Sequence, residues 1–236
     1  MKLRLDFITL FPEIIEGYFA SGILSQGIKK GLIEVHAHYL RNWGEGNYRQ
    51  VDDRVFGGGA GMLLMFEPMQ RAIAHVESEY EAASIKREDY KIIATSAGGE
   101  TYLSSTAKRL VDCKAIMILC GRYEGFDQRI LDELVDMEIS IGNYVLSGGE
   151  LAGLVIADSV GRLVPGVLGN SESYQHDSFY KDDNLSQFPQ YTRPESLNYE
   201  GKELKVPDIL LSGHHAEIEK WRQSGVKKVA IAKEDK

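Results

Sequence analysis

Short apolar runs alternate with helical patterns through the first two thirds of the chain, and this alternation constrains the fold most. Strands are predicted at residues 3–10, 33–39, 91–95, 115–119 and 137–141. Helices are predicted at residues 12–19, 21–30, 68–79, 104–110, 127–134 and 151–163. Such alternation favours a mostly parallel sheet covered by helices on both faces. Ligands of these sheets bind beyond the carboxyl ends of the strands.

The composition fits one large domain, or one domain with a smaller appendage. Of the 236 residues, 43% are hydrophobic, which is enough for a sizeable core. No apolar run approaches the roughly 20 residues needed to cross a bilayer, and nothing resembles a signal peptide. Cys113 and Cys120 are too few for a disulfide scaffold. We therefore expect a cytoplasmic protein with no membrane partner.

The charge balance leaves the partner open. A formal net charge of -8 argues, taken alone, against nucleic acid, because phosphate contacts dominate such affinity. Basic groups nevertheless occur locally at residues 29–30, 41–54 and 220–228. A solvated acidic surface and a locally basic site for a polyanion are both compatible with this pattern.

Three strands run into loops of small or unusual residues, at 95–99, at 120–125 and within 138–150. Because the carboxyl ends of parallel strands meet at one edge, these loops should build one pocket. The last segment, EISIGNYVLSGGE, lacks the crowded glycines and the Lys of a phosphate-binding loop. Its apolar bend predicts an adenine-containing ligand held by shape and by backbone groups.

Two further motifs admit two interpretations each. The stretch VDDRVFGGGAGM at 51–62 is too rich in glycine for a helix or a packed strand. It is either a flexible surface loop or a loop whose backbone approaches a ligand. In CGRYEG at 120–125, Arg122 either pairs with Glu124 around a tight turn, or Glu124 binds a ribose hydroxyl or a cation.

The pattern breaks after residue 163. Residues 164–191 are polar and irregular, which predicts a linker. A helix that opens at 212 or 213 and runs to 223 predicts a small helical second domain. Arg162 ends the preceding long helix, where the helix dipole favours a cation. Asp177 either caps a helix or acts chemically.

Two histidine motifs are weak signals. His176 is interpreted as a solvated side chain. His214 and His215 are neighbours, so on a helix they point in different directions. No third ligand is suitably spaced, and no metal-ligating residues are predicted.

Several segments form an ordered set along the whole chain. They are DFITLFPEI at 6–14, VDDRVFGGGAGM at 51–62, CGRYEGFDQRI at 120–130, SIGNYVLSGGEL at 140–151, VPGVLG at 164–169, DSF at 177–179, YTRPE at 191–195 and SGHHAEIEKWR at 212–222. Each is weak alone, but the set in this order is highly specific. It resembles the bacterial tRNA (guanine-N1)-methyltransferase family, TrmD, which modifies the guanine 3′ to the anticodon.

The resemblance implies a fold and a domain organisation. The fold is an α/β SPOUT fold, a parallel sheet with a deep trefoil knot, followed by a small mainly helical C-terminal domain. Residues 1–163 would form the knotted catalytic domain, 164–176 the linker and 177–236 the tRNA-binding domain. The general rule against knots would not have suggested this topology. The resemblance also implies a homodimer with active sites between the subunits.

The resemblance further implies S-adenosylmethionine as methyl donor, tRNA as substrate and Mg²⁺ as an aid to turnover. Carried over residue by residue, the cofactor-binding positions are Ser96, Gly121, Glu124, Ile141, Gly142, Asn143, Tyr144, Val145, Leu146, Gly148 and Gly149. The tRNA-binding positions are Arg54, Gly57, Gly58, Gly59 and His214. Asp177 would be the general base and Arg162 its electrostatic partner, and the linker would order over the target base when tRNA binds.

The chemistry of the reaction is consistent with these two roles. Guanine N1 carries a proton at neutral pH and is a poor nucleophile until that proton leaves, so a carboxylate within hydrogen-bond reach can take it. Negative charge then develops toward O6, where an Arg stabilises the transition state. The donor methyl is already activated on a sulfonium, so positioning supplies much of the remaining catalysis.

The sequence departs from the family pattern in three places. Asn143 stands where Asp is common, and Ala97 and Gly98 replace the usual Pro and Gln. Beyond Arg222 the usual Arg-rich helix is replaced by QSGVKK. Two other functions compete with the enzyme: an RNA-binding module of the same fold without catalysis, and a nucleotide-dependent oxidoreductase. The Arg162 and Asp177 pair disfavours the first, and the missing GxGxxG fingerprint disfavours the second.

Overall fold

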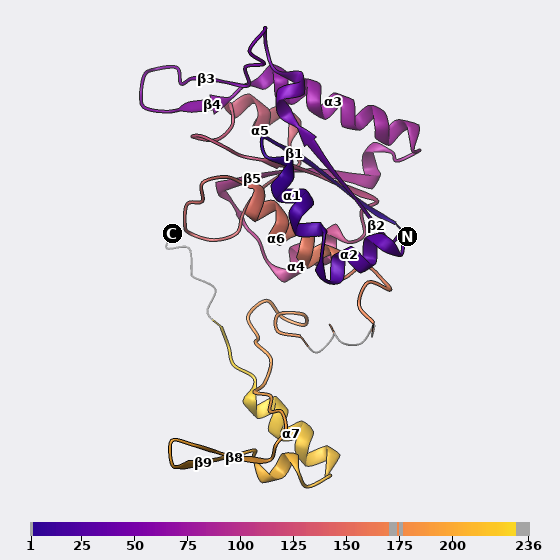
Figure 1. Cartoon of the computed structure of the whole chain (residues 1–236), viewed down its shortest axis with the longest axis vertical. Helices are drawn as coiled ribbons and strands as arrows, with labels where there is room; N and C mark the ends of the chain where they lie inside the picture. Colours follow the sequence, from indigo (N-terminus) through magenta and orange to yellow (C-terminus); the bar gives the residue numbers. More distant parts are fainter. Residues whose placement is uncertain (1, 170–173, 175–176, 230–236) are drawn as a thin grey trace. The chain divides into compact units, whose positions relative to one another are not determined.

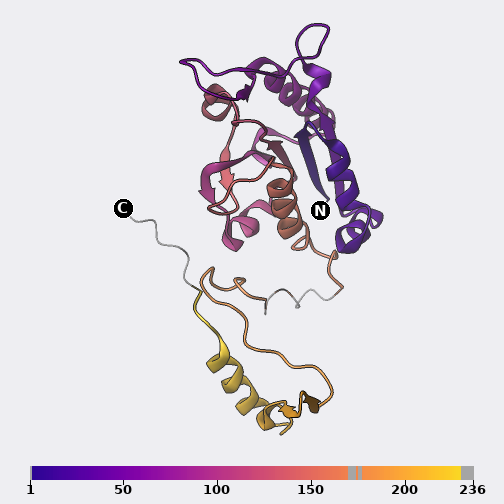
Figure 2. The same ribbon diagram turned by 60° about the vertical axis from the view of Figure 1, so that its left-hand side comes forward.

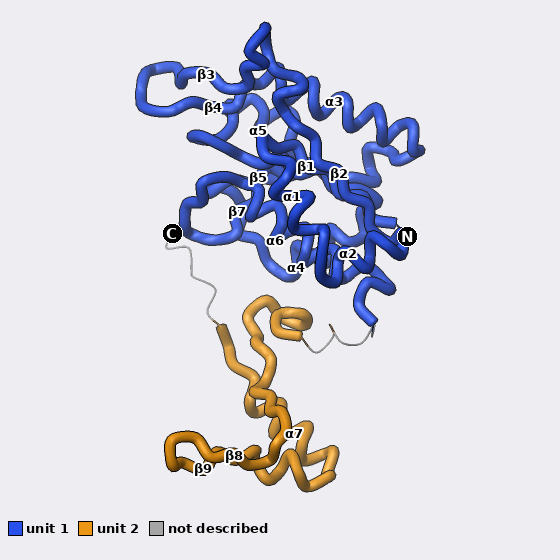
Figure 3. The backbone as a smooth tube through the Cα atoms, in the orientation of Figure 1, with its two compact units in different colours: residues 1–171 blue, residues 172–236 orange. Residues whose placement is uncertain are grey.

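A computed structural model describes residues 2–169, 174 and 177–229 of the chain. It divides into two compact units, residues 1–171 and 172–236, each of which is described here by itself (Figure 3). His176 and part of the predicted linker lie outside the described residues. No described helix is long and apolar enough to cross a membrane.

The first unit is built on a sheet of five parallel strands in the order β2-β1-β6-β5-β7. The strands are β1 (Leu3–Thr9), β2 (Ile33–Tyr39), β5 (Tyr90–Thr101), β6 (Ala115–Cys120) and β7 (Met137–Ser140). All five predicted strands are confirmed. The central strand β6 is buried at every position, which explains why its sequence, AIMILC, is apolar throughout.

Helices cover both faces of this sheet (Figures 1 and 2). One face carries α1 (Pro12–Phe19), α2 (Gly22–Lys29), α4 (Ser104–Leu110) and α6 (Glu150–Gly161), and the other carries α3 (Phe66–Ala82) and α5 (Gln128–Leu134). Along β6, Ile116 and Ile118 enter the first core, whereas Met117 and Leu119 enter the second. Successive side chains of a strand point to opposite faces of the sheet, which explains why they enter different cores. Each such buried side chain contributes about 1.5–3 kcal/mol.

The local sequence explains how these helices begin. Pro12 stands at the first turn of α1, where its missing N–H costs nothing. Asp127 caps α5, and its carboxylate accepts a hydrogen bond from the backbone N–H of Arg129 at 3.0 Å. Single 3₁₀ turns, η1 (Leu40–Trp43) and η2 (Arg87–Asp89), complete the connections.

Strand β5 is longer than the predicted 91–95. Its pairing with β7 breaks after Thr95 and resumes at Glu100, and both residues pair with Ile139. Residues 96–99 therefore bulge out of the ladder at the carboxyl end of the strand. The predicted loop at 95–99 is this bulge.

A short antiparallel hairpin surrounds the glycine-rich loop. Its strands are β3 (Asp52–Arg54) and β4 (Met62–Leu64). The prediction that the whole of 51–62 is a loop is wrong at both ends, because the residues that flank the glycines pair as strands. The glycines themselves lie in the connection between the strands.

The second unit contains a hairpin as well as the expected helix. Strands β8 (Ser196–Tyr199) and β9 (Lys202–Lys205) pair antiparallel, and Glu200 and Gly201 turn the chain with φ of 51° and 77°. A 3₁₀ turn, η4 (Asp208–Leu210), precedes α7 (His215–Gly225). The predicted helix is confirmed, but the expectation of a mainly helical domain left out the hairpin.

Candidate functional site

One cavity of about 500 Å³ lies at the carboxyl ends of β5, β6 and β7. The three loops that the sequence predicts to converge all line it, which confirms that expectation. The lining residues are Thr95–Gly98, Gly121–Phe126, Gln128, Leu131, Glu138, Ser140–Gly142, Tyr144–Gly149 and Ala152. This volume is in the usual range for a small-molecule site, roughly 300–1,000 Å³.

The predicted cofactor positions lie around this cavity, with one exception. The lining includes Ser96, Gly121, Glu124, Ile141, Gly142, Tyr144, Val145, Leu146, Gly148 and Gly149. Asn143 is exposed in the same bend but is not a lining residue. Arg122, Tyr123 and Glu138 also line the cavity but are not among the predicted cofactor-binding residues. Their position in or beside the strand-end loops could have indicated them.

The loop after β7 crosses the ends of β5 and β6 in close contact. The backbone N–H of Gly149 donates to the carbonyl of Gly121 at 2.7 Å. A Cβ at Gly149 would lie 2.0 Å from Thr95 Oγ1, so only glycine fits this crossing. The Thr95 hydroxyl donates to the Leu119 carbonyl at 3.1 Å and accepts from the Gly121 N–H at 3.3 Å. The Thr95 side chain thereby links β5 to the end of β6 and to the loop that follows it.

The bend at 141–146 is held by its own backbone. Gly142 has a φ of 150°, and its N–H donates to Ser140 Oγ at 3.3 Å. Its carbonyl accepts from the N–H of Tyr144 at 2.9 Å. Val145, at the tip, is 87% exposed. The bend therefore offers apolar side chains and turned backbone to a ligand.

Arg122 links this loop to Glu150 at the start of α6, and this pair of residues is here called the clamp. Its guanidinium lies 2.8 Å from Oε2 of Glu150 as an ion pair and donates through Nε to Oε1 at 3.1 Å. It also donates to the Ser147 carbonyl at 3.1 Å and stacks 4.2 Å from the ring centroid of Phe11. The interpretation that Arg122 pairs with Glu124 is wrong, because the crossing of the loop brings a distant carboxylate closer.

The clamp is anchored in the core. Glu150 is 1% exposed, and its Oε1 also accepts from the Thr9 hydroxyl at 2.7 Å. A buried charge of this kind requires a partner and hydrogen bonds, and Arg122 and Thr9 supply them. The start of α6 is thus fixed to β1 and to the loop after β6.

The glycine-rich hairpin joins the pocket at its rim. The N–H of Glu124 donates to the Met62 carbonyl at 3.0 Å, and the Glu124 side chain packs over Gly61. Burial and the neighbouring Asp52 raise the pKa of Tyr123, which adopts a φ of 59°.

The residues expected to bind tRNA lie on this hairpin and directly before α7. Arg54 is exposed at the end of β3. Gly57, Gly58 and Gly59 have φ values of 84°, 85° and 128° with open space around them. His214 is the residue before α7, in the second unit.

Arg162 and Asp177 belong to different units. Arg162 follows α6, and its N–H donates to the Asp158 carbonyl at 3.0 Å. The Asp177 carbonyl accepts from the Tyr180 N–H at 3.3 Å. Residues 177–180 form a bend and a turn rather than a helix. The alternative that Asp177 caps a helix is therefore wrong.

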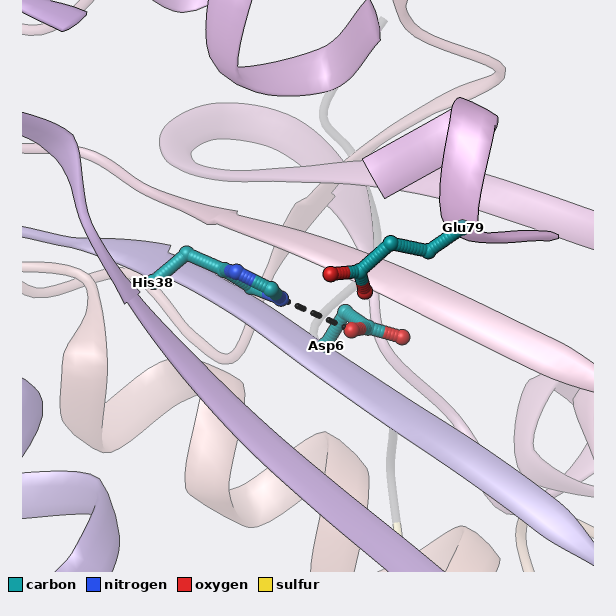
Figure 4. Close-up of side chains that lie close together, drawn as sticks. All are labelled: Asp6, His38 and Glu79. Carbon is teal, nitrogen blue, oxygen red and sulfur yellow. Dashed lines mark hydrogen bonds and ion pairs between the residues drawn. The ribbon is translucent and has the colours of Figure 1, made fainter. Parts of the chain in front are cut away.

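A second group of polar side chains lies away from the cavity. A carboxylate oxygen of Asp6, a ring nitrogen of His38 and a carboxylate oxygen of Glu79 lie within 4.8 Å of one another, as in a possible metal site (Figure 4). Arg4 hydrogen-bonds both carboxylates, and Tyr80 donates to Asp6 at 2.7 Å. Burial alone would raise the pKa of Asp6, but the hydrogen bonds from His38 and Arg4 hold it below its usual value. Arg4 thus already supplies the cation for these carboxylates.

The first unit is a parallel α/β domain with a cavity of small-molecule size at the carboxyl edge of its sheet. Comparison with known proteins narrows this class. The family model described as tRNA (Guanine-1)-methyltransferase TrmD matches residues 3–234. The chain belongs to this family, and the resemblance is confirmed.

Individual relatives agree. The tRNA (guanine-N(1)-)-methyltransferase of Geobacter sp. (strain M21) is 46% identical over 98% of this chain and 87% of its own length. That of Christiangramia forsetii is 47% identical over 94% of this chain and 92% of its own. The crystal structure of tRNA (m1G37) methyltransferase from Aquifex aeolicus aligns with a TM-score of 0.73 at 40% identity, covering 94% of this chain and 88% of that one.

Proposed function

We propose that this member of the tRNA (guanine-N1)-methyltransferase family methylates N1 of the guanine 3′ to the anticodon, position 37, with S-adenosylmethionine as methyl donor. The observation that carries the proposal is the cavity at the strand ends, whose lining coincides with nearly all the donor-binding positions expected from the family. We infer from the tRNA substrate that the protein acts in the cytoplasm.

The cavity has the features that such a donor needs. Apolar side chains of Ile141, Leu146 and Leu131 line a wall suited to a flat ring. Glu124 and Glu138 supply carboxylates, which favour a sulfonium or a ribose hydroxyl. When bound, S-adenosylmethionine supplies a methyl group already activated for transfer. The residues present therefore fit the group.

The remaining chemistry concerns the target base. Asp177 takes the N1 proton, which turns guanine into a competent nucleophile. The guanidinium of Arg162 stabilises the negative charge that develops toward O6. Arg54 of the hairpin and His214 of the second unit bind the tRNA and so position the guanine. Mg²⁺ assists turnover. Turnover with and without a chelator tests the metal.

The path of the chain is consistent with the knot of a SPOUT fold. The loop after β7 passes so close to Thr95 of β5 and to Gly121 after β6 that position 149 has no room for a side chain. The clamp of Arg122 and Glu150 then fixes the chain on the far side of this crossing. We propose that this crossing closes a deep trefoil knot, which a traced crystal structure would test.

The surface of α1 and α6 fits a second copy of the chain. Ile14 and Tyr18 are exposed at i,i+4 spacing on α1, and Leu151 and Val155 are exposed at the same spacing on α6. The two helices touch, and the Tyr18 hydroxyl donates to Asp158 at 2.5 Å. An exposed apolar surface on two touching helices marks an interaction site. We propose a homodimer across it, with the active sites between subunits.

The proposed roles are tested with Asp177→Asn. This variant keeps the shape of the side chain but cannot accept the N1 proton as a carboxylate does. We expect binding of S-adenosylmethionine at the wild-type level and a kcat for tRNA methylation lower by a factor on the order of 10²–10⁴. Methylation at the wild-type rate would remove Asp177 from the mechanism, and lost donor binding would make its role structural.

A further inference from the structure

Residues 177–187 form a loop, here called the Asp177 loop, that contains one residue in an uncommon backbone conformation. Phe179 has a φ of 66°, in the left-handed region that bulky residues rarely adopt. Its N–H donates to the Leu185 carbonyl at 2.7 Å, and the N–H of Gln187 donates to Ser178 Oγ at 2.8 Å. These bonds fold residues 184–187 back onto the two residues that follow Asp177. Backbone in such a conformation persists only where its surroundings hold it.

What holds residues 184–187 is the segment after α7, residues 227–229, here called the closing segment. The N–H of Ser186 donates to the Lys227 carbonyl at 2.9 Å, and the N–H of Val229 donates to the Asn184 carbonyl at 2.7 Å. Leu185 and Lys228 face each other between these bonds as an antiparallel bridge. The closing segment is thus held to residues 184–186 by two backbone hydrogen bonds and an antiparallel bridge.

The helix places the closing segment where it can do this. Gly225, the last residue of α7, lies so close to Pro189 that a Cβ there would be 2.9 Å from Pro189 Cδ. The Arg222 guanidinium stacks 5.2 Å from the Phe188 ring centroid. The chain leaving α7 is therefore fixed beside residues 188–189 and returns directly along residues 184–186.

We propose that the closing segment is a positioning element of the methyl-transfer reaction: it holds the Asp177 loop in the conformation from which the carboxylate reaches guanine N1. The inference rests on the proposed function, because it gives the closing segment a role only if Asp177 acts. A displacement of about 1 Å at a reacting group lowers the rate by as much as roughly 10²-fold. Loss of the bridge should therefore appear in kcat.

The test removes one backbone donor at a time in the full chain. Val229→Pro deletes the N–H that bonds the Asn184 carbonyl. Lys228→Pro is the matched control, because the described residues offer that N–H no acceptor and proline is tolerated at such a position of an edge strand. Lys228→Ala separately removes the charge, since a lysine here could act on tRNA phosphates instead.

We expect Val229→Pro to lower kcat about 10- to 100-fold while the KM for S-adenosylmethionine is unchanged. Hydrogen exchange of the Phe179 amide should accelerate, whereas the amides of α7 keep their protection. Both Lys228 variants should stay within about twofold of the wild-type kcat, and Lys228→Ala should change only the KM for tRNA and its salt dependence.

Three results would overturn the proposal. They are a wild-type kcat in Val229→Pro despite faster exchange at Phe179, an equal loss of kcat in Lys228→Pro, and loss of protection throughout α7, which would make the segment a folding element. The proposed function fails differently. If Asp177→Asn methylates tRNA at the wild-type rate, the role of Asp177 is wrong whatever the Val229 variant does.

Discussion

At the scale of single residues, Asp6 is completely buried in the middle of β1, and its neighbours compensate its charge. Arg4 forms two hydrogen bonds to it at 2.8 Å, and His38 and Tyr80 add one each at 2.8 and 2.7 Å. A buried carboxylate that lost these partners would be costly. The group joins β1, β2 and α3 and is structural.

The stability of the protein should therefore depend on Asp6 in a pH-dependent way. The folded-state pKa lies below the ordinary value of 3.8. The contribution of the carboxylate is thus complete above pH about 4 and is lost as pH falls through the folded-state pKa. We expect Asp6→Asn to lower the free energy of unfolding by about 3 kcal/mol at pH 7, measured by urea denaturation. The gap should narrow at pH 3; the same gap at both values would contradict the account.

The residues around the cavity were predictable to the extent that their signals are local. Gly121 and Leu146 lie in loops that directly follow strands, and Ser96 lies in the bulge of β5. Parallel strands bring such segments together at one edge of the sheet. The partner of Arg122 was not predictable in this way. Glu150 lies 28 positions further along the chain, and only the crossing of the loop after β7 brings the two charges together. Asn143 is in the predicted bend but is exposed and does not line the cavity.

At the scale of elements, long periodic segments were predictable and short pairings were not. Each strand of the main sheet has its own apolar pattern, and AIMILC in β6 is the clearest example. The hairpins β3-β4 and β8-β9 have strands of only three or four residues. At that length a periodic pattern cannot be distinguished from a loop. Their ladders depend on partners and turns rather than on propensity.

At the scale of the whole molecule, the parallel sheet followed from the alternation of elements, but its strand order did not. Alternation alone fixes neither the neighbour of β7 nor the crossing of the loop that follows it. The pairing of β7 with β5 carries residues 141–149 back across the strand ends, and this path makes the cavity. The resemblance to the family predicts a knot at this crossing, which the general rule against knots would have excluded, and the knot stays a proposal.

The assembly is a prediction at the same scale. Val155→Asp places a charge among the exposed apolar side chains of α1 and α6, where Val155 is 46% exposed in the single chain. We expect the wild-type protein to sediment as a dimer and the variant as a monomer, because an unpaired charge in an apolar interface is costly. Glu13→Ala, at an exposed position on α1 that is polar in the wild type, is the control. A monomeric wild-type protein would contradict the proposed dimer.

The central claim is that the cavity and the Asp177 loop together methylate one guanine of tRNA. The most direct measurement is transfer of labelled methyl from S-adenosylmethionine to a tRNA transcript, with the modified base identified by mass spectrometry. The account predicts one methyl group per tRNA, on N1 of the guanine 3′ to the anticodon, and none when that guanine is replaced by adenine. Equal labelling of the replaced transcript, or no labelling of either, would contradict it.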